Sequence, residues 1–160
     1  MQLKSIYLGA TPVIDISALR GMPLTDCDLG ETRVKDIGAL QGMPLIGLGL
    51  RNTLVTDLSA LQGAPIERLH LHNTLVGDLF ALRGMPLKEL RLDGCRNIKD
   101  LSPLAECSQL ERVSLPLQLL DLEPLRQLPK LKTISLRIDG DWDRAPKIAD
   151  FWKAYDAKKK

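Results

Sequence analysis

The sequence predicts an α/β solenoid with a curved parallel β-sheet on its concave side, short helical or 3₁₀ segments on its convex side, and a C-terminal capping helix. The main observation is that segment 66–86, IERLHLHNTLVGDLFALRGMP, recurs with small changes at 3–23, 24–44 and 45–65. Each copy opens on LxxLxL or a close variant, and this alternation of apolar and polar residues indicates a strand with one buried face. The opening residues lie 21 apart, with one step of 23, at Leu3, Leu24, Leu45, Ile66, Leu87, Leu110 and Leu131.

A fixed period of this length, headed by LxxLxL, is typical of leucine-rich repeats. Successive strands must lie parallel, because every repeat returns the chain to the same place. We expect residues 1–140 to form the solenoid, with about seven repeats, and residues 141–160 to form a C-terminal cap helix and a basic tail.

The outer part of each repeat reads D-[LI]-x-x-L-x-G-M-P or close to it. A carboxylate ahead of a helical turn accepts hydrogen bonds from its first free N–H groups, so the recurring aspartates are interpreted as N-caps. A metal site is the alternative, but calcium needs several carboxylates from one loop, and no repeat supplies them. The closing glycines suit a left-handed C′ position, and the prolines stop the turn from continuing. The six aspartates are Asp15, Asp36, Asp57, Asp78, Asp100 and Asp121.

A second column carries Thr11, Thr32, Thr53 and Thr74, and Cys95 continues it. We interpret these side chains as a buried ladder that satisfies turn N–H and C=O groups, since no base accompanies any threonine to make it a nucleophile. Repeat five breaks the pattern with one more residue in its turn, and segment 105–109 replaces the Gly-Met-Pro closing with a longer, more helical one.

The two ends of the repeat stack differ. Ile148, Phe151, Trp152 and Tyr155 follow helical spacing, so we expect a helix whose apolar face covers the last repeat. A membrane-surface or partner-binding helix is the alternative. At the other end Leu3 already occupies a strand position, which predicts an uncapped apolar edge. The expectation is that the chain is the C-terminal part of a longer protein, or that this edge pairs with another molecule, as in a homodimer.

Composition and charge exclude several classes of protein. The net charge is +2 without a clustered basic face, so no nucleic acid partner is expected. The three cysteines show neither disulfide nor zinc spacing. The start lacks the features of a signal peptide, and no stretch approaches the length of a transmembrane span. These observations predict a cytoplasmic setting, with no membrane partner and no cofactor.

The repeats resemble the short bacterial leucine-rich repeats of pattern LxxLxLxxTxVxDLSPLxGMPL, and Ser102, Pro103 and Leu104 match its DLSPL form. Such arrays are similar to those beside serine/threonine protein kinases of planctomycetes and related bacteria, and ADFWKAYDA at 149–157 resembles their ending. The resemblance implies a repeat array attached to a signalling protein. The chain has no Gly-rich loop, HRD-type loop or DFG of its own, so it implies no kinase activity. The outer segments are also similar in size to those of internalins, whose concave face binds host proteins.

The polar strand positions of a leucine-rich repeat point to the concave side, and here they vary while the apolar frame stays constant. They form a mixed, mostly basic patch over repeats three to six. Arginine offers forked donors to carboxylates and phosphates, so we hypothesise a protein partner with an acidic patch. His70 and His72 share a strand face and could hold a metal, but no third ligand is evident, so no metal is predicted. The candidate partner-binding residues are Arg51, Arg68, His70, His72, Glu89, Arg91, Asp93 and Arg112.

The predicted function is therefore a non-catalytic protein–protein interaction module that binds a partner through the concave face. One alternative is a regulatory or substrate-recognition region of a larger bacterial signalling protein, such as a serine/threonine kinase. A structural self-association module is another. An enzyme is the rival class, but it needs a nucleophile with a base, or carboxylates beside a cleft, and the sequence suggests neither.

Overall fold

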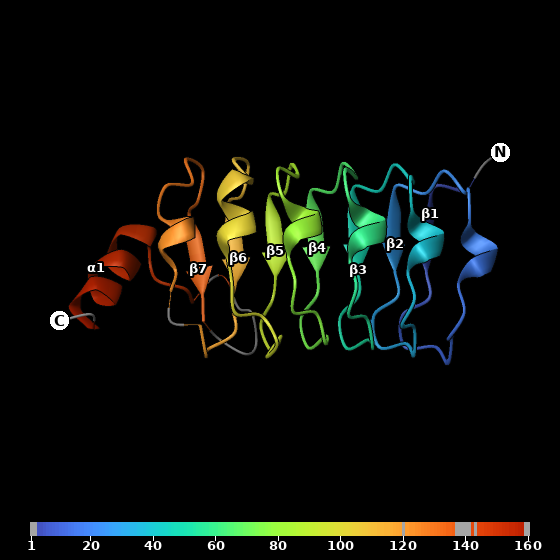
Figure 1. The fold of residues 1–160 in the computed structure, drawn as a ribbon, viewed down its shortest axis with the longest axis horizontal. Coiled ribbons are helices and arrows are strands. Elements are labelled where there is room, and N and C mark those ends of the chain that lie inside the picture. Colours follow the sequence, from blue (N-terminus) through green and yellow to red (C-terminus); the bar gives the residue numbers. More distant parts are fainter. Residues whose placement is uncertain (1–2, 120, 137–141, 143, 159–160) are drawn as a thin grey trace.

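The computed structural model describes residues 3–119, 121–136, 142 and 144–158, and it shows a seven-stranded parallel sheet in the order β1 to β7 (Figure 1). Each strand is three residues long and comes from one repeat, as the LxxLxL pattern predicts. The fold class expected from the sequence, a leucine-rich repeat solenoid, is confirmed. The strands are Ser5–Tyr7, Asp26–Asp28, Gly47–Gly49, Arg68–His70, Glu89–Arg91, Arg112–Ser114 and Thr133–Ser135.

The repeat period sets the register of the sheet. Ile6 pairs with Cys27, Cys27 with Leu48 and Leu48 with Leu69, each 21 residues further along. Their side chains all point into one hydrophobic core that runs the length of the stack, and Cys27 behaves there as a small apolar residue. Burial raises the pKa of the Cys27 thiol to about 12 and that of Cys107 to about 11.

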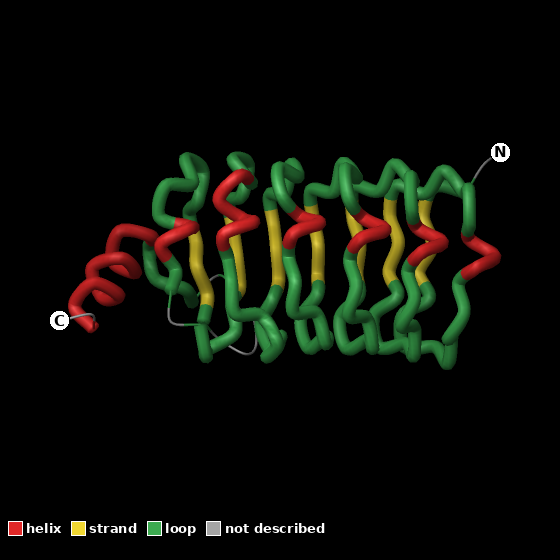
Figure 2. Tube along the Cα trace, in the orientation of Figure 1, coloured by secondary structure: helices red, strands yellow, loops and turns green. Residues whose placement is uncertain are grey.

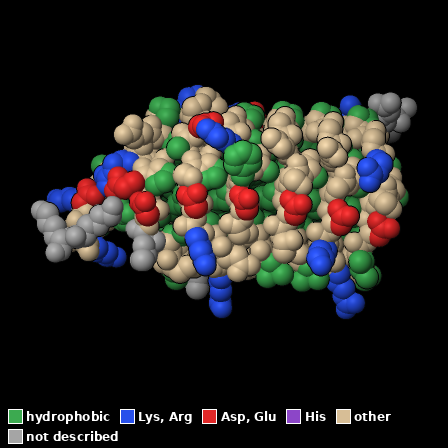
Figure 3. All heavy atoms as spheres, viewed as in Figure 1, with side chains coloured by type: hydrophobic (Ala, Val, Ile, Leu, Met, Phe, Trp, Pro, Cys, Tyr) green, Lys and Arg blue, Asp and Glu red, His purple; other side chains and the backbone are tan. Residues whose placement is uncertain are grey.

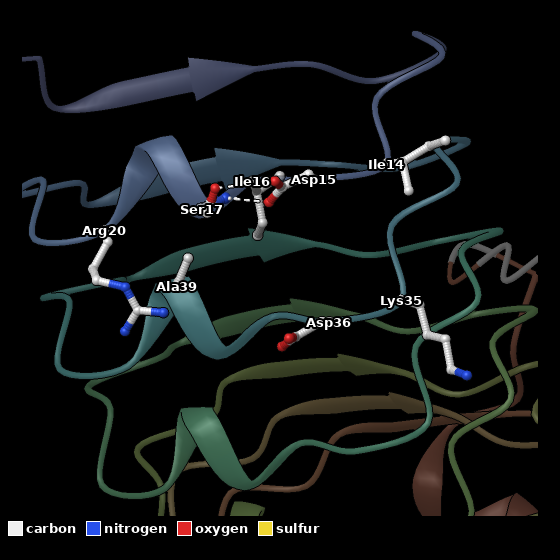
Figure 4. A pocket seen from close by; sticks show the side chains of 8 residues that line it. All are labelled: Ile14, Asp15, Ile16, Ser17, Arg20, Lys35, Asp36 and Ala39. Atoms are coloured by element: carbon white, nitrogen blue, oxygen red, sulfur yellow. Dashed lines mark hydrogen bonds between the residues drawn. The ribbon is translucent and has the colours of Figure 1, made fainter.

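Short 3₁₀ segments face the sheet across the core (Figure 2). Every recurring aspartate accepts a hydrogen bond from the N–H two residues on, where the 3₁₀ segment begins. Figure 4 shows this for Asp15, which accepts from the N–H of Ser17 at 2.7 Å and from its hydroxyl at 3.1 Å. The predicted hydrogen bonds to the first N–H of each segment are confirmed, but the N-cap position is held by the next residue, such as Ile16, and the aspartate lies one residue before it. The segments η1 to η6 are Ser17–Leu19, Gly38–Leu40, Ser59–Leu61, Phe80–Leu82, Ser102–Glu106 and Glu123–Leu125.

The recurring aspartates form a row across the convex surface (Figure 3). Hydrogen bonds from the backbone N–H groups of Ser17 and Ser59 are the main reason that the pKa of Asp15 and of Asp57 lies below its ordinary value. Over the described ranges, no three His, Cys, Asp or Glu side chains gather closely enough to hold a metal ion. Each carboxylate serves its own repeat.

The closing glycines adopt the left-handed conformation that the sequence predicts. Arg20 has φ −52° and ψ 128°, Gly21 has φ 76°, and the N–H of Met22 donates to the Leu19 carbonyl at 3.0 Å. These values define a type II turn, in which the third residue needs a positive φ. In repeat five, η5 is five residues long, which confirms the longer outer segment expected there.

The threonine column is a buried hydrogen-bond ladder, as predicted. The hydroxyls of Thr32 and Thr53 donate to the carbonyls of Leu29 and Leu50 at 2.6 and 2.7 Å. In repeat five the Cys95 thiol takes over and donates to the carbonyl of Leu71 in the preceding repeat at 3.0 Å. The hydrogen bonds of Thr32 and Thr53 therefore stay within their own turns, and the Cys95 bond joins the turns of repeats four and five.

The C-terminal helix α1, Ile148–Lys158, lies against the last repeat, so the expected cap is confirmed. Phe151 is buried in the core, and Ile148, Trp152 and Tyr155 pack against it. The Tyr155 hydroxyl accepts a hydrogen bond from the N–H of Leu122 at 3.0 Å. None of the described helices is long and apolar enough to cross a membrane.

The edge of the stack at β1 exposes apolar side chains, as expected. Leu3 is 53% exposed, whereas its equivalent Leu24 in the next repeat is fully buried. Ile6, Leu8 and Val13 are partly exposed for the same reason, since no repeat packs against them among the described residues.

Candidate concave binding surface

The sheet register places the predicted site residues in three adjacent columns on the concave face. One column contains Asp26, Gly47, Arg68, Glu89 and Arg112, and a second contains Tyr7, Asp28, Gly49, His70 and Arg91. The third lies just after the strands and contains Arg51, His72 and Asp93. The three columns form one continuous surface from β2 to β6.

Arg68 reaches across a whole repeat to a carboxylate. Its Nη2 lies 3.2 Å from Oδ1 of Asp26, and the two residues are 42 apart in the sequence. Gly47 lies between them and makes this contact possible, because a Cβ there would lie 2.6 Å from the same Asp26 oxygen. The sequence shows the glycine but not the bridge across it.

Arg51 makes a comparable pair with Asp28. Its Nη1 lies 2.9 and 3.0 Å from the two carboxylate oxygens of Asp28, and its Nε lies 3.4 Å from Glu31. The side chain lies directly on Gly30, where a Cβ would collide with it at 2.6 Å. The hydrogen bond with Asp28 raises the pKa of Arg51 above its ordinary value.

Glu89 contacts two residues of the surface, His70 and Arg112, through its carboxylate. One carboxylate oxygen lies 2.9 Å from His70 Nε2, and the other lies 2.9 Å from Arg112 Nη2. The Glu89 side chain is only 15% exposed, which shields its carboxylate from water, whereas Arg112 is 48% exposed. The hydrogen bond with His70 is the main reason that the pKa of Glu89 lies below its ordinary value.

Asp93 is buried and accepts a hydrogen bond from the Ser114 hydroxyl, and Arg91 Nε lies 4.0 Å from its Oδ1. Burial lowers the pKa of the neighbouring His72, although the nearby Asp93 acts in the opposite direction.

The His70 and His72 rings are 6.2 Å apart and tilted. Around this histidine pair, the described residues supply no third metal ligand. The Ser114 hydroxyl donates to the Asp93 carboxylate and accepts a hydrogen bond from the N–H of Leu92 at 3.3 Å.

Seven of the eight predicted residues thus lie on one surface with Asp93 buried beneath it, and four of their neighbours there were not predicted as part of it. Asp26 and Asp28 provide the carboxylates that pair with Arg68 and Arg51. Gly47 and Gly49 leave a hollow of about 140 Å³, and its lining includes Arg51, Arg68 and His70. Gly47 and Gly49 occupy both polar positions of β3, and this feature of the sequence could have indicated the hollow.

Trp142 also belongs to this surface. Its indole lies 5.6 Å from the guanidinium of Arg91 and 5.9 Å from that of Arg112, within the range of a cation–π contact. Trp142 follows the last repeat, so no column of the repeat pattern could place it above β5 and β6.

Comparison with known proteins bears on the fold alone. No protein-family model matches the sequence, and no curated protein matches it. Among solved structures, internalin C2 from Listeria monocytogenes is similar, with a TM-score of 0.64 and 22% sequence identity. The match covers 84% of this chain and 71% of that one. The chain therefore has the leucine-rich repeat solenoid architecture seen in internalin C2.

Proposed function

We propose that the chain is a non-catalytic protein–protein interaction module that binds its partner through the concave face. One observation carries the proposal: the core positions of the seven strands are uniformly apolar, whereas the concave columns present arginine, histidine, tyrosine and carboxylate side chains. Arginine and tyrosine are enriched among the residues that dominate protein interfaces. The similarity to internalin C2 supports the solenoid fold that presents this face.

The interactions within the surface favour binding over chemistry. Ion pairs hold Arg51, Arg68 and Arg112 in defined positions before any partner arrives, which lowers the entropy lost on association. A rigid, preorganised and shallow surface of this kind suits recognition of another protein. Three buried thiols, none of them in a disulfide, fit a reducing cytoplasmic setting for the module.

The test is affinity capture with matched variants. Arg68→Glu with Arg112→Glu reverses two exposed concave charges, and Arg20→Glu with Lys35→Glu reverses two exposed convex charges as the control. We expect the concave variant to lose proteins that the wild type and the convex variant both retain, as measured by quantitative mass spectrometry. Identical retention by the concave and convex variants would refute binding through the concave face.

A second candidate is self-association through the β1 edge, which the exposure of Leu3 and the partly exposed Ile6 favour. A dimer seen by light scattering after size exclusion, and lost in Leu3→Lys, would support it. A monomer at all concentrations would exclude it. The regulatory region of a larger bacterial signalling protein is one setting for either role, and this setting rests on the resemblance of the repeats alone.

A further inference from the structure

A second exposed surface runs along the solenoid where the chain leaves the strands and turns toward the convex side. In repeats two to five, the residue that follows the ladder residue is exposed there, and we call these four residues the turn edge. Leu54 is 50% exposed and Leu75 is 49% exposed. Basic and apolar side chains gather along the lower border of the view in Figure 3. The turn edge consists of Arg33, Leu54, Leu75 and Arg96.

The two arginines of the turn edge are not neutralised in the way that the concave arginines are. On the concave face Arg51, Arg68 and Arg112 each pair with a carboxylate. Within the described ranges, the side chains of Arg33 and Arg96 make neither an ion pair nor a hydrogen bond. The turn edge therefore presents two unpaired cations with two half-exposed leucines between them. Its complement is an apolar centre with an acidic group on each side.

The backbone of the turn edge is already hydrogen-bonded along the row. The N–H groups of Arg33, Leu54 and Leu75 donate to valine carbonyls of the preceding repeats at 3.0, 3.1 and 3.2 Å. An extended peptide binds best where it can add a strand to an unpaired sheet edge, and these turns offer none. A helix pairs its backbone groups internally and needs only side-chain contacts. The turn edge therefore suits a helix better than an extended segment.

We propose that the turn edge binds an amphipathic helix of a protein partner, with acidic side chains over Arg33 and Arg96 and an apolar stripe over Leu54 and Leu75. Successive repeats lie about 4.8 Å apart, so the four residues stand at roughly 0, 4.8, 9.6 and 14.4 Å. Positions i, i+4, i+7 and i+11 share one helix face and stand at roughly 0, 6, 10.5 and 16.5 Å. Flexible arginine side chains can absorb the difference of about 2 Å.

Charge favours a helix over a lipid surface. The row of aspartates on the convex face lies next to this border in Figure 3. A broad anionic membrane would also meet that row and be repelled by it, whereas a single helix contacts only the column of four residues. The turn edge is separate from the concave columns, so this inference goes beyond the proposed function and does not depend on it.

The probes are helical peptides of about 20 residues on an alanine and glutamine background. The matching peptide carries glutamate at positions 5 and 16 and leucine at positions 9 and 12. The permuted peptide exchanges the two residue types, so its composition and net charge are unchanged. A third peptide has lysine in place of both glutamates. Circular dichroism confirms equal helix content before binding is measured by fluorescence anisotropy at low ionic strength.

We expect the matching peptide to bind on the order of tenfold more tightly than either control peptide, from two exposed charge pairs and the burial of two half-exposed leucines. Arg33→Gln, Arg96→Gln and Leu75→Ser should each weaken this binding. The matched controls are Arg20→Gln and Phe80→Ser, which change an exposed cation and an exposed apolar residue away from the turn edge and should leave binding unchanged.

The inference is overturned if the matching and permuted peptides bind alike, if the control variants weaken binding as much as the turn-edge variants, or if no peptide binds. Vesicles that contain phosphatidylserine provide a further arm. Vesicle binding that is lost in Arg33→Gln and Arg96→Gln, without peptide binding, would assign the turn edge to a membrane and overturn the helix. The concave variant Arg68→Glu with Arg112→Glu should bind the matching peptide normally, so the two proposals can fail independently.

Discussion

Glu89 links the stability of the sheet to the candidate surface, and replacing it with glutamine tests how that surface is held together. The substitution keeps the size of the side chain but removes the charge that His70 and Arg112 share. A hydrogen bond to a charged group contributes about 1.5–3 kcal/mol, and glutamine keeps part of each contact. We therefore expect Glu89→Gln to lower the free energy of unfolding by about 1–3 kcal/mol at pH 7. Urea unfolding followed by circular dichroism measures the change.

The pH dependence of this loss gives a second readout. The pKa of Glu89 is lowered in the folded protein, so its charge stabilises the fold above the ordinary carboxyl pKa, and that stability is lost as pH falls through the folded value. The difference between wild type and Glu89→Gln should therefore shrink on acidification below about pH 4.5, the ordinary range for glutamate.

Glu106→Gln is the matched control, because Glu106 also pairs with an arginine, Arg83, but on an exposed part of the surface. It should leave the unfolding midpoint unchanged, since exposed ion pairs contribute little. The reasoning about Glu89 fails if both variants behave alike, or if the effect of Glu89→Gln at pH 7 persists unchanged in acid.

Three further changes test the repeat frame, each by urea unfolding. Gly42→Ala meets no atom within 4 Å but forces alanine to a φ of 73°, so a loss of about 1–2 kcal/mol is expected, and no loss would contradict the type II turn. Thr53→Val leaves the buried Leu50 carbonyl without its hydroxyl donor and should cost about 1–3 kcal/mol, whereas a neutral result would contradict the ladder. Phe151→Ala removes the buried residue of α1 and should cost about 3–5 kcal/mol with a red shift of Trp152 fluorescence, and unchanged fluorescence would contradict the cap.

The repeat period explains why so much of the frame could be predicted. Because the repeat is 21 residues long, Leu48 lies beside Leu69 and Thr32 beside Thr53. The residues of the core, of the threonine ladder and of the concave columns can therefore be predicted from their spacing in the sequence. Backbone hydrogen bonds and close packing then permit only one register, because a shift by one residue would turn the leucines outward. The hydrogen bonds of the aspartates could be predicted as well, because each aspartate bonds within its own repeat.

The ion pairs of the candidate surface could not be predicted from this spacing. A long side chain can pair with a residue two repeats away when the residue between them lacks a Cβ, as Arg68 does across Gly47. Arg68 passes over Gly47 to Asp26, and Trp142 returns from beyond the last strand to Arg91. The sequence by itself determined which residues share each column, because the repeat length fixes which residues of successive strands lie side by side. Only the tertiary structure decided which charges pair across the columns, because that depends on side-chain reach and open space between distant repeats.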